Sequence, residues 1–148
     1  MQLRWGFLSV LLLSCAISCS ATKDLLQTNI LDHSNLALHI HPTLEIEILG
    51  ERRGLPSNIG ITDEKLRVIH THDPDGRLHV ESPVPHQFAL ADFFTIWGKT
   101  FTGKCIFEYC IDGDHVLDMF VNGEKSELYE NLPLKDQDRI KIIYRKNK

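Results

Sequence analysis

Five of the chain's eight histidines fall into two short clusters, which makes them the residues best suited to chemistry. His39 and His41 form one cluster, and residues 70–81 form the other, with three histidines and a glutamate. Neutral imidazole nitrogens, with a carboxylate as a further ligand, suit copper or zinc better than calcium or magnesium. We therefore predict a copper or zinc site formed by His39, His41, His70, His72, His79 and Glu81.

The second cluster is interrupted by strong turn chemistry, Asp73-Pro74-Asp75-Gly76, which predicts a β-hairpin. A four-residue loop places His70 opposite His79 and leaves the other face to Ile69, Thr71, Leu78 and Val80. A type I turn with a glycine bulge instead moves His79 to that other face, beside Thr71. The hydrophobic pattern favours the first register, because pairing normally follows the buried face.

The first cluster lies in residues 36–49, where apolar and polar residues alternate as in a half-buried strand. The apolar residues share even numbers, whereas His39 and His41 share odd numbers with the polar residues. The two histidines are therefore predicted to lie on the polar face. Pro42 has no N–H to donate to a neighbouring strand, so it marks a sheet edge or a bulge.

Two other interpretations of the histidines stand beside the metal site. A hydrogen-bonded structural cluster and unrelated surface histidines both give the same His-x-His pattern, since polar alternation alone produces it. His33, His86 and His115 lie outside both clusters and are not included in the site. The chain shows no serine or cysteine nucleophile with a matching base, so we expect no enzymatic activity.

The N-terminus has the features of an export signal. Phe7–Ile17 is an apolar run that is too short for a membrane-spanning helix, which needs about 20 residues. Ala16-Ile17-Ser18-Cys19 resembles a bacterial lipobox, which predicts a lipoprotein signal peptide over residues 1–18 and lipidation at Cys19. Cys15 is an alternative lipidation site, and ordinary secretion with cleavage near Ser20 or Ala21 is a second interpretation.

Lipidation after export would place the protein in the cell envelope. The chain is then secreted across the inner membrane and held by its lipid, facing the periplasm or the cell surface. Loss of residues 1–18 removes one positive charge, Arg4, and changes the net charge from −4 to −5. This charge argues against a nucleic-acid partner, which requires a clustered basic face. The sequence does not indicate a protein partner.

The remaining chain is expected to comprise a tether over residues 19–35 and one β domain over residues 36–148. Short alternating segments separated by turns predict about seven or eight strands, in a small antiparallel sandwich or partly open barrel. Apolar residues at helical spacing predict one short helix over residues 89–97, ending at Gly98. We therefore assign the chain to the mainly β class.

Cys105 and Cys110 are the two cysteines of the predicted β domain. If residues 105–110 form a strand, as their pattern suggests, the cysteines lie about 16 Å apart. A disulfide requires Cα atoms about 5.5 Å apart, so the pair bonds only if residues 106–109 turn. Two interpretations therefore stay open: the cysteines are unbonded small apolar residues, or they form a disulfide.

Several short motifs are spread over residues 37–144: His39-x-His41, Ile59-Gly-Ile61, His70-Thr-His-Asp, His79-Val-Glu-Ser82, Asp92-Phe-Phe, Trp97-Gly98 and Val121-Asn-Gly123. Together they resemble a group of uncharacterised small secreted domains from bacteria and archaea. The resemblance implies a shared fold unit and no activity. Residues 134–142 are also similar to the last strand of β-grasp proteins, but the C-terminal Gly-Gly of the sulfur carriers is absent, which removes the carrier function.

We predict that Cys19→Ala leaves the protein without a lipid and, if it is exported, soluble. The reason is the small-residue run directly before Cys19, after the apolar segment. Labelling with a radioactive fatty acid measures this. Undiminished label in the variant moves the site to Cys15, and an unlabelled wild-type protein contradicts lipidation altogether.

Overall fold

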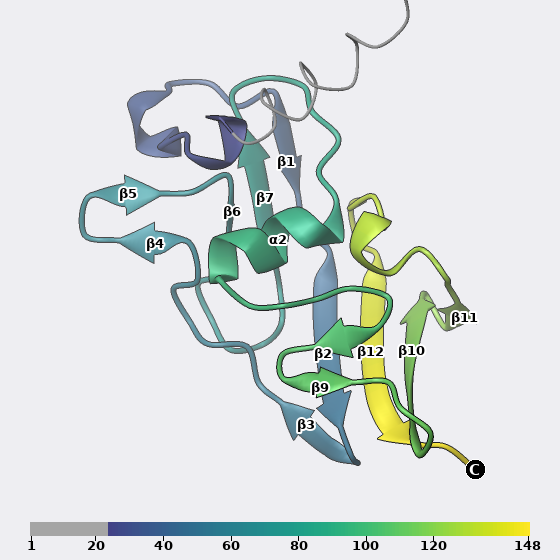
Figure 1. The fold of residues 1–148 in the computed structure, drawn as a ribbon. Helices are drawn as coiled ribbons and strands as arrows, with labels where there is room; N and C mark the ends of the chain where they lie inside the picture. The colour runs from purple at the N-terminus through teal and green to yellow at the C-terminus, as the bar shows by residue number, and fades with distance from the viewer. Residues whose placement is uncertain (1–23) are drawn as a thin grey trace, which may run out of the picture.

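The computed structural model describes residues 24–148, and the predicted signal peptide and both candidate lipidation cysteines lie outside this range. The fold is mainly β, as predicted, and α2 (Leu90–Trp97) is the expected short helix (Figure 1). The strands are β1 (Leu38–Ile40), β2 (Thr43–Ile48), β3 (Glu51–Arg53), β4 (Ile61–Thr62), β5 (Lys65–Leu66), β6 (Ile69–His70), β7 (His79–Ser82), β8 (Cys105–Ile106), β9 (Tyr109–Cys110), β10 (His115–Val121), β11 (Glu124–Lys125) and β12 (Arg139–Lys146). Two 3-10 turns, η1 (Ile30–Asp32) and η2 (Tyr129–Asn131), are also present, and residues 24–26 are helical.

The largest sheet has five strands in the order β11-β10-β12-β2-β3. Its pairs are antiparallel except for β12 and β2, which run parallel, so the expectation of purely antiparallel pairing is wrong at this pair. Within residues 24–148 no sheet closes into a barrel. The last strand, β12, lies at the centre of the sheet. Alternate residues of β2 and β12 point into the core, as their alternating sequence predicts.

The predicted histidine strands form a second, three-stranded sheet in the order β1-β7-β6. Pro42 lies where the chain leaves β1 and enters β2, so one extended segment contributes a strand to each sheet (Figure 1). Two hydrogen bonds tie this crossing to the hairpin: Leu78 N–H donates to Pro42 C=O at 2.9 Å, and Leu44 N–H donates to Gly76 C=O at 2.8 Å. The chain before the hairpin turn does not form one continuous strand, because β5 pairs with β4 and β6 pairs with β7.

The core fills the space between the sheets and α2. Phe93 and Phe94 of the helix are buried, and the Phe94 ring stacks on Phe101 with ring centres 4.6 Å apart. The N-terminal turn is capped by Asp92, whose side chain accepts a hydrogen bond from Ala89 N–H at 2.8 Å. Gly98 ends the helix, as predicted.

Part of the segment expected as a tether is attached to the domain. Leu26 and Ile30 are buried in the hydrophobic core. The Arg67 guanidinium donates to Leu26 C=O at 2.9 Å, and Asn29 accepts a hydrogen bond from Leu66 N–H at 3.0 Å. Residues 24–30 are therefore fixed beside β5 by both packing and hydrogen bonds.

Cys105 and Cys110 form a disulfide, which decides between the two readings of this pair. The prediction of one strand over residues 105–110 is wrong: β8 and β9 form a hairpin that places the two cysteines directly opposite each other. Phe107, at the turn, has a φ of 55°. The reversal brings the two Cα atoms to 4.0 Å, instead of the separation of an extended strand.

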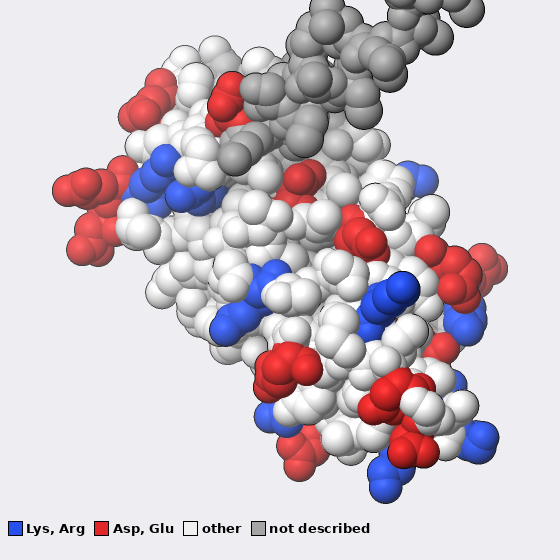
Figure 2. All heavy atoms as spheres, in the orientation of Figure 1, with Lys and Arg blue, Asp and Glu red and all other residues white. Residues whose placement is uncertain are grey.

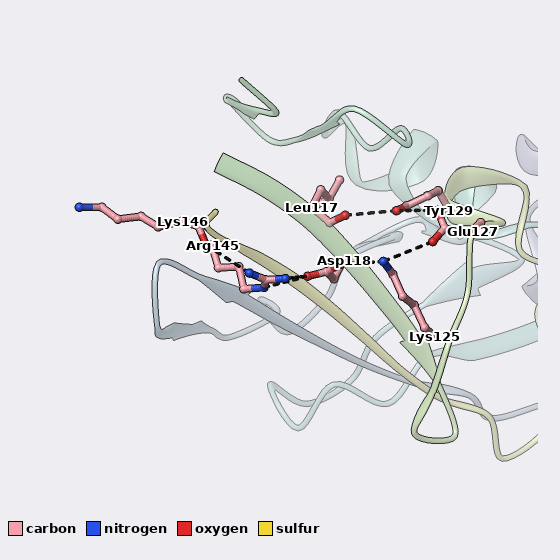
Figure 3. Close-up of polar contacts among 7 residues, drawn as sticks. All are labelled: Leu117, Asp118, Lys125, Glu127, Tyr129, Arg145 and Lys146. Carbon is pink, nitrogen blue, oxygen red and sulfur yellow. Dashed lines mark hydrogen bonds and ion pairs between the residues drawn. The ribbon is translucent and has the colours of Figure 1, made fainter. Parts of the chain in front are cut away.

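A charged network crosses the outer face of the large sheet (Figure 3). The Arg145 guanidinium bonds Asp118 from β12 at 2.6 Å, and Lys125 of β11 reaches the same carboxylate at 3.2 Å. Burial alone would raise the pKa of Asp118, but the hydrogen bonds from Lys125 and Arg145 hold that pKa below its usual value. The carboxylate therefore stays charged and links three neighbouring strands.

Charges of both signs are interspersed on the face drawn in Figure 2. Among residues 24–148 no helix is long and apolar enough to cross a membrane.

Gly76 provides a test of how the hairpin turn is held against β2. Its φ is +89°, and a Cβ there would lie 2.5 Å from Leu44 C=O. Gly50 has a similar φ of +86°, but a Cβ there meets no described atom within 4 Å. Gly50→Ala should therefore cost only the strain of a left-handed residue, about 1 kcal/mol. Gly76→Ala should lower the free energy of unfolding by about 1–3 kcal/mol more, because the backbone at Leu44 must move to make room for the methyl group.

Urea unfolding of the two variants and the wild-type protein measures this difference. Gly50→Ala is the matched control, since both glycines have the same left-handed backbone. Equal losses of stability in the two variants would show that the turn does not press against β2.

Candidate metal centre

Four of the six predicted ligand residues lie on three short paired strands, and His41 and His72 lie just beyond β1 and β6. The central strand is β7, which pairs with β1 so that His39 lies opposite Glu81, and with β6 so that His70 lies opposite His79. The register of β1 and β7 continues to an isolated bridge further along the two segments, so His41 falls opposite His79. His79 is thus flanked by a histidine on each side. The four-residue loop favoured by the hydrophobic pattern is confirmed.

The ligand nitrogens form two groups of three, each lying within 4.8 Å of one another. The outer group is His39, His41 and His79, and the inner group is His70, His72 and His79.

In the outer group two nitrogens already lie at a separation that suits one ion. His39 Nε2 and His41 Nε2 are 3.1 Å apart. Two nitrogens that each bind a tetrahedral zinc at about 2.0–2.1 Å lie about 3.3 Å from each other. Glu81 adds an oxygen to this group, because its Oε1 lies 3.1 Å from His39 Nε2 and 4.0 Å from His79 Nδ1. The outer group therefore offers three nitrogens and one carboxylate oxygen.

The inner group is made of imidazoles alone and is more enclosed. The rings of His70 and His79 are stacked, with centres 5.3 Å apart and planes at 16°. His72 meets both rings edge-on, at 4.9 Å from His70 and 4.7 Å from His79. His70 is only 1% exposed, whereas His72 is exposed to solvent.

His70 is buried although it lies on the face of the hairpin opposite the apolar residues. Both Ile69 and His70 are buried, so the short strand β6 is enclosed on both faces. The alternation of the sequence identified the apolar face correctly. It did not reveal that the opposite face is also covered.

His70 is held in the neutral, metal-binding form. Burial is the largest cause that lowers its pKa, to about 4, and the neighbouring His72, His79 and His39 lower it further. The Arg67 carbonyl opposes this effect, since His70 Nδ1 donates a hydrogen bond to it at 3.0 Å. That bond fixes the proton on Nδ1 and leaves the Nε2 lone pair as the ligand, as is usual for histidines that bind metals.

His79 is shifted in the same direction. Burial is the main cause that lowers its pKa, and His41 and His72 add to the lowering, against the attraction of Glu81. Both histidines therefore favour the unprotonated ring that a metal ion requires.

Sequence reasoning missed two features beside the cluster. Asp136 Oδ1 accepts a hydrogen bond from His41 N–H at 2.8 Å, and this bond is the main cause that lowers the pKa of Asp136. The two residues are 95 positions apart, and no local pattern links them. The second feature is an open pocket beside the inner group, lined by His72, Asp73, Asp75, Arg77 and His79. The turn residues had been assigned a structural role only.

The other histidines with described side-chain contacts lie apart from the cluster, as expected. His115 Nδ1 contacts Asp112 at 2.9 Å and its ring stacks on Tyr144. The ring of His86 packs edge-on against Phe88.

The chain matches no protein-family model, no curated protein and no solved structure. The chemical assignment of the site therefore rests on its geometry. Two groups of three histidines, which share His79, are each arranged so that they can hold a metal ion.

The lowered pKa of His70 predicts a loss of stability in acid. In the unfolded chain histidine has a pKa near 6.5, whereas folded His70 has a pKa of about 4. Between these values the unfolded chain binds more protons, so stability is full above about pH 6.5 and falls as the pH drops toward 4. His70 alone accounts for at most about 3 kcal/mol of this loss.

We expect His70→Gln to flatten this pH dependence, because glutamine does not titrate. Urea unfolding of metal-free protein in a chelator, at a series of pH values from 4 to 7, measures the slope. His33→Gln is the control, since His33 is exposed and should leave the slope unchanged. A wild-type slope in His70→Gln would contradict the neutral, buried state of His70.

Proposed function

We propose that this chain is a membrane-anchored, extracytoplasmic lipoprotein domain that binds copper or zinc through its histidine cluster. The observation that carries the proposal is that five histidines on or just beyond strands β1, β6 and β7 form two groups of converging nitrogens, with Glu81 beside them. A metal-binding domain of this kind serves in storage, delivery or sensing of the ion, and the proposal includes no catalytic step.

The choice of metal follows from the donor atoms. Imidazole nitrogen is the main donor in both groups, and Glu81 supplies the one nearby carboxylate among the proposed ligands. Calcium and magnesium prefer oxygen ligands, whereas zinc and copper bind imidazole well. The hydrogen bond from His70 to Arg67 C=O supports the same choice, since it orients the ring for ligation.

The extracytoplasmic location is supported by the disulfide between Cys105 and Cys110. Disulfides persist mainly outside the reducing cytoplasm. The membrane anchor itself rests on the lipobox-like sequence before Cys19, which lies outside the described residues.

A second candidate function is a non-catalytic interaction domain of the cell envelope with structural histidines. The observation in its favour is that the cluster has hydrogen-bond partners of its own. His39 Nε2 lies 3.1 Å from both His41 Nε2 and Glu81 Oε1, and His70 bonds Arg67 C=O. Metal titration separates the two functions, because a structural cluster has no need of an ion.

Replacement of His72 and His79 together should abolish tight metal binding. The double variant His72→Ala/His79→Ala takes ligands from both groups, and neither side chain is fully buried, so folding should survive. Isothermal titration of the untagged protein with copper and with zinc measures affinity. Wild-type protein should also gain about 3 kcal/mol of stability at an ion concentration 100 times the dissociation constant.

His33→Ala is the matched control, because it removes an exposed histidine that belongs to neither group. It should bind as the wild-type protein does. Identical isotherms for the wild-type protein and the double variant would exclude the proposed site and favour the interaction domain.

A further inference from the structure

We propose that the centre holds two metal ions and that the His79 imidazole bridges them. The proposal rests on the proposed function, since it requires that the cluster binds metal. It adds that the two groups of ligands act as two sites, with His79 as their shared member.

The first argument is the way the ligand atoms divide. Within residues 24–148 the candidate nitrogens form two groups of three and do not form one group of five. His39 and His41 belong to one group only, His70 and His72 belong to the other, and His79 belongs to both. A single ion bound by all five histidines would require the two ends of the cluster to move together.

The second argument is the position of His79 in the sheet. It lies on the central strand β7, opposite His70 on β6 and, by continuation of the register, opposite His41 on β1. Its ring meets His41 on one side at 4.7 Å and His72 on the other at 4.7 Å, nearly edge-on in both cases. The sheet therefore sets one imidazole between two pairs of imidazoles.

The third argument concerns the two nitrogens of that ring. His79 Nδ1 lies 4.0 Å from Glu81 Oε1, and the same oxygen lies 3.1 Å from His39 Nε2. Nδ1 is thus on the side of the outer group, which leaves Nε2 as the ligand for the inner group. An imidazole can serve two ions only by using both nitrogens in this way.

Binding of the second ion replaces a proton on the ring. The remaining N–H bond of His79 breaks, a nitrogen–metal bond forms, and the proton leaves to the solvent. No electron transfer and no further reactant are involved.

The two positions differ in their ligands and their access. The outer ion receives His39, His41, His79 and the Glu81 carboxylate, which completes a four-ligand set. The inner ion receives three imidazoles, the ligand count that leaves one position open in many metal sites. The open pocket beside His72 lies next to the inner position, so a small ligand from solvent can approach that ion.

The test is the number of ions and their magnetic coupling in the full untagged protein. Equilibrium dialysis against copper(II), followed by elemental analysis, should give two ions per wild-type chain. Electron paramagnetic resonance should lose intensity per copper when the second equivalent binds, because a bridging imidazolate couples the two unpaired spins. His39→Ala/His41→Ala should retain one ion with the full uncoupled signal, and both residues are accessible enough for the variant to fold.

His72→Ala is the complementary variant, which should retain the outer ion and also lose the coupling. One ion in the wild-type chain would overturn the two-ion centre while leaving the proposed function intact. Two ions with an undiminished signal would overturn the bridge. A chain that binds no copper would contradict the proposed function itself, so the two failures are distinguishable.

Discussion

The structure depends on the register of β6 against β7, in which His70 pairs with His79 and Ile69 pairs with Val80. Ile69 and Val80 are fully buried in the core, and the histidines occupy the other face. Because side chains alternate along a strand, a slip of one residue would exchange the two sets. The hydrophobic effect that selects this register therefore also places the imidazoles. Core and site are two faces of the same pairing.

This hairpin is coupled to the larger sheet through the crossing at Pro42. The chain first forms β1 in the three-stranded sheet that carries the histidines. It then continues into β2, which pairs with β12 at the centre of the five-stranded sheet. Proline suits the crossing because it leaves no N–H unpaired where the strand changes partners. Asp136, just before β12, also bonds the backbone of His41. The outer ligands are thus positioned by the central pairing of β2 with β12, which extends over six residue pairs and favours a pre-organised site.

Local patterns in the sequence predicted the parts of the fold that short-range rules control. The Asp73–Gly76 turn, the alternation of residues 43–48 and the helical spacing of residues 90–97 each depend on neighbours within a few residues. The parallel pairing of β12 with β2, the Asp136 contact and the burial of His70 depend on segments far apart in the chain. The prediction of one strand over residues 105–110 failed because the chain reverses at Phe107, a residue type that does not signal a turn. The sequence pattern singled out the five histidines, but their division into two groups depends on the pairing of three strands, which local patterns do not reveal.

A cluster of five imidazoles lowers the stability of the folded protein when its rings become protonated. The pKa of His70 falls to about 4 mainly because burial removes its hydration, and repulsion from protonated neighbouring rings lowers it further. A metal ion would offset this unfavourable free energy, because it binds neutral nitrogens that already converge and have lost their water. The features that make the metal-free cluster sensitive to acid are thus those that leave its nitrogens unprotonated and able to bind a metal ion at neutral pH.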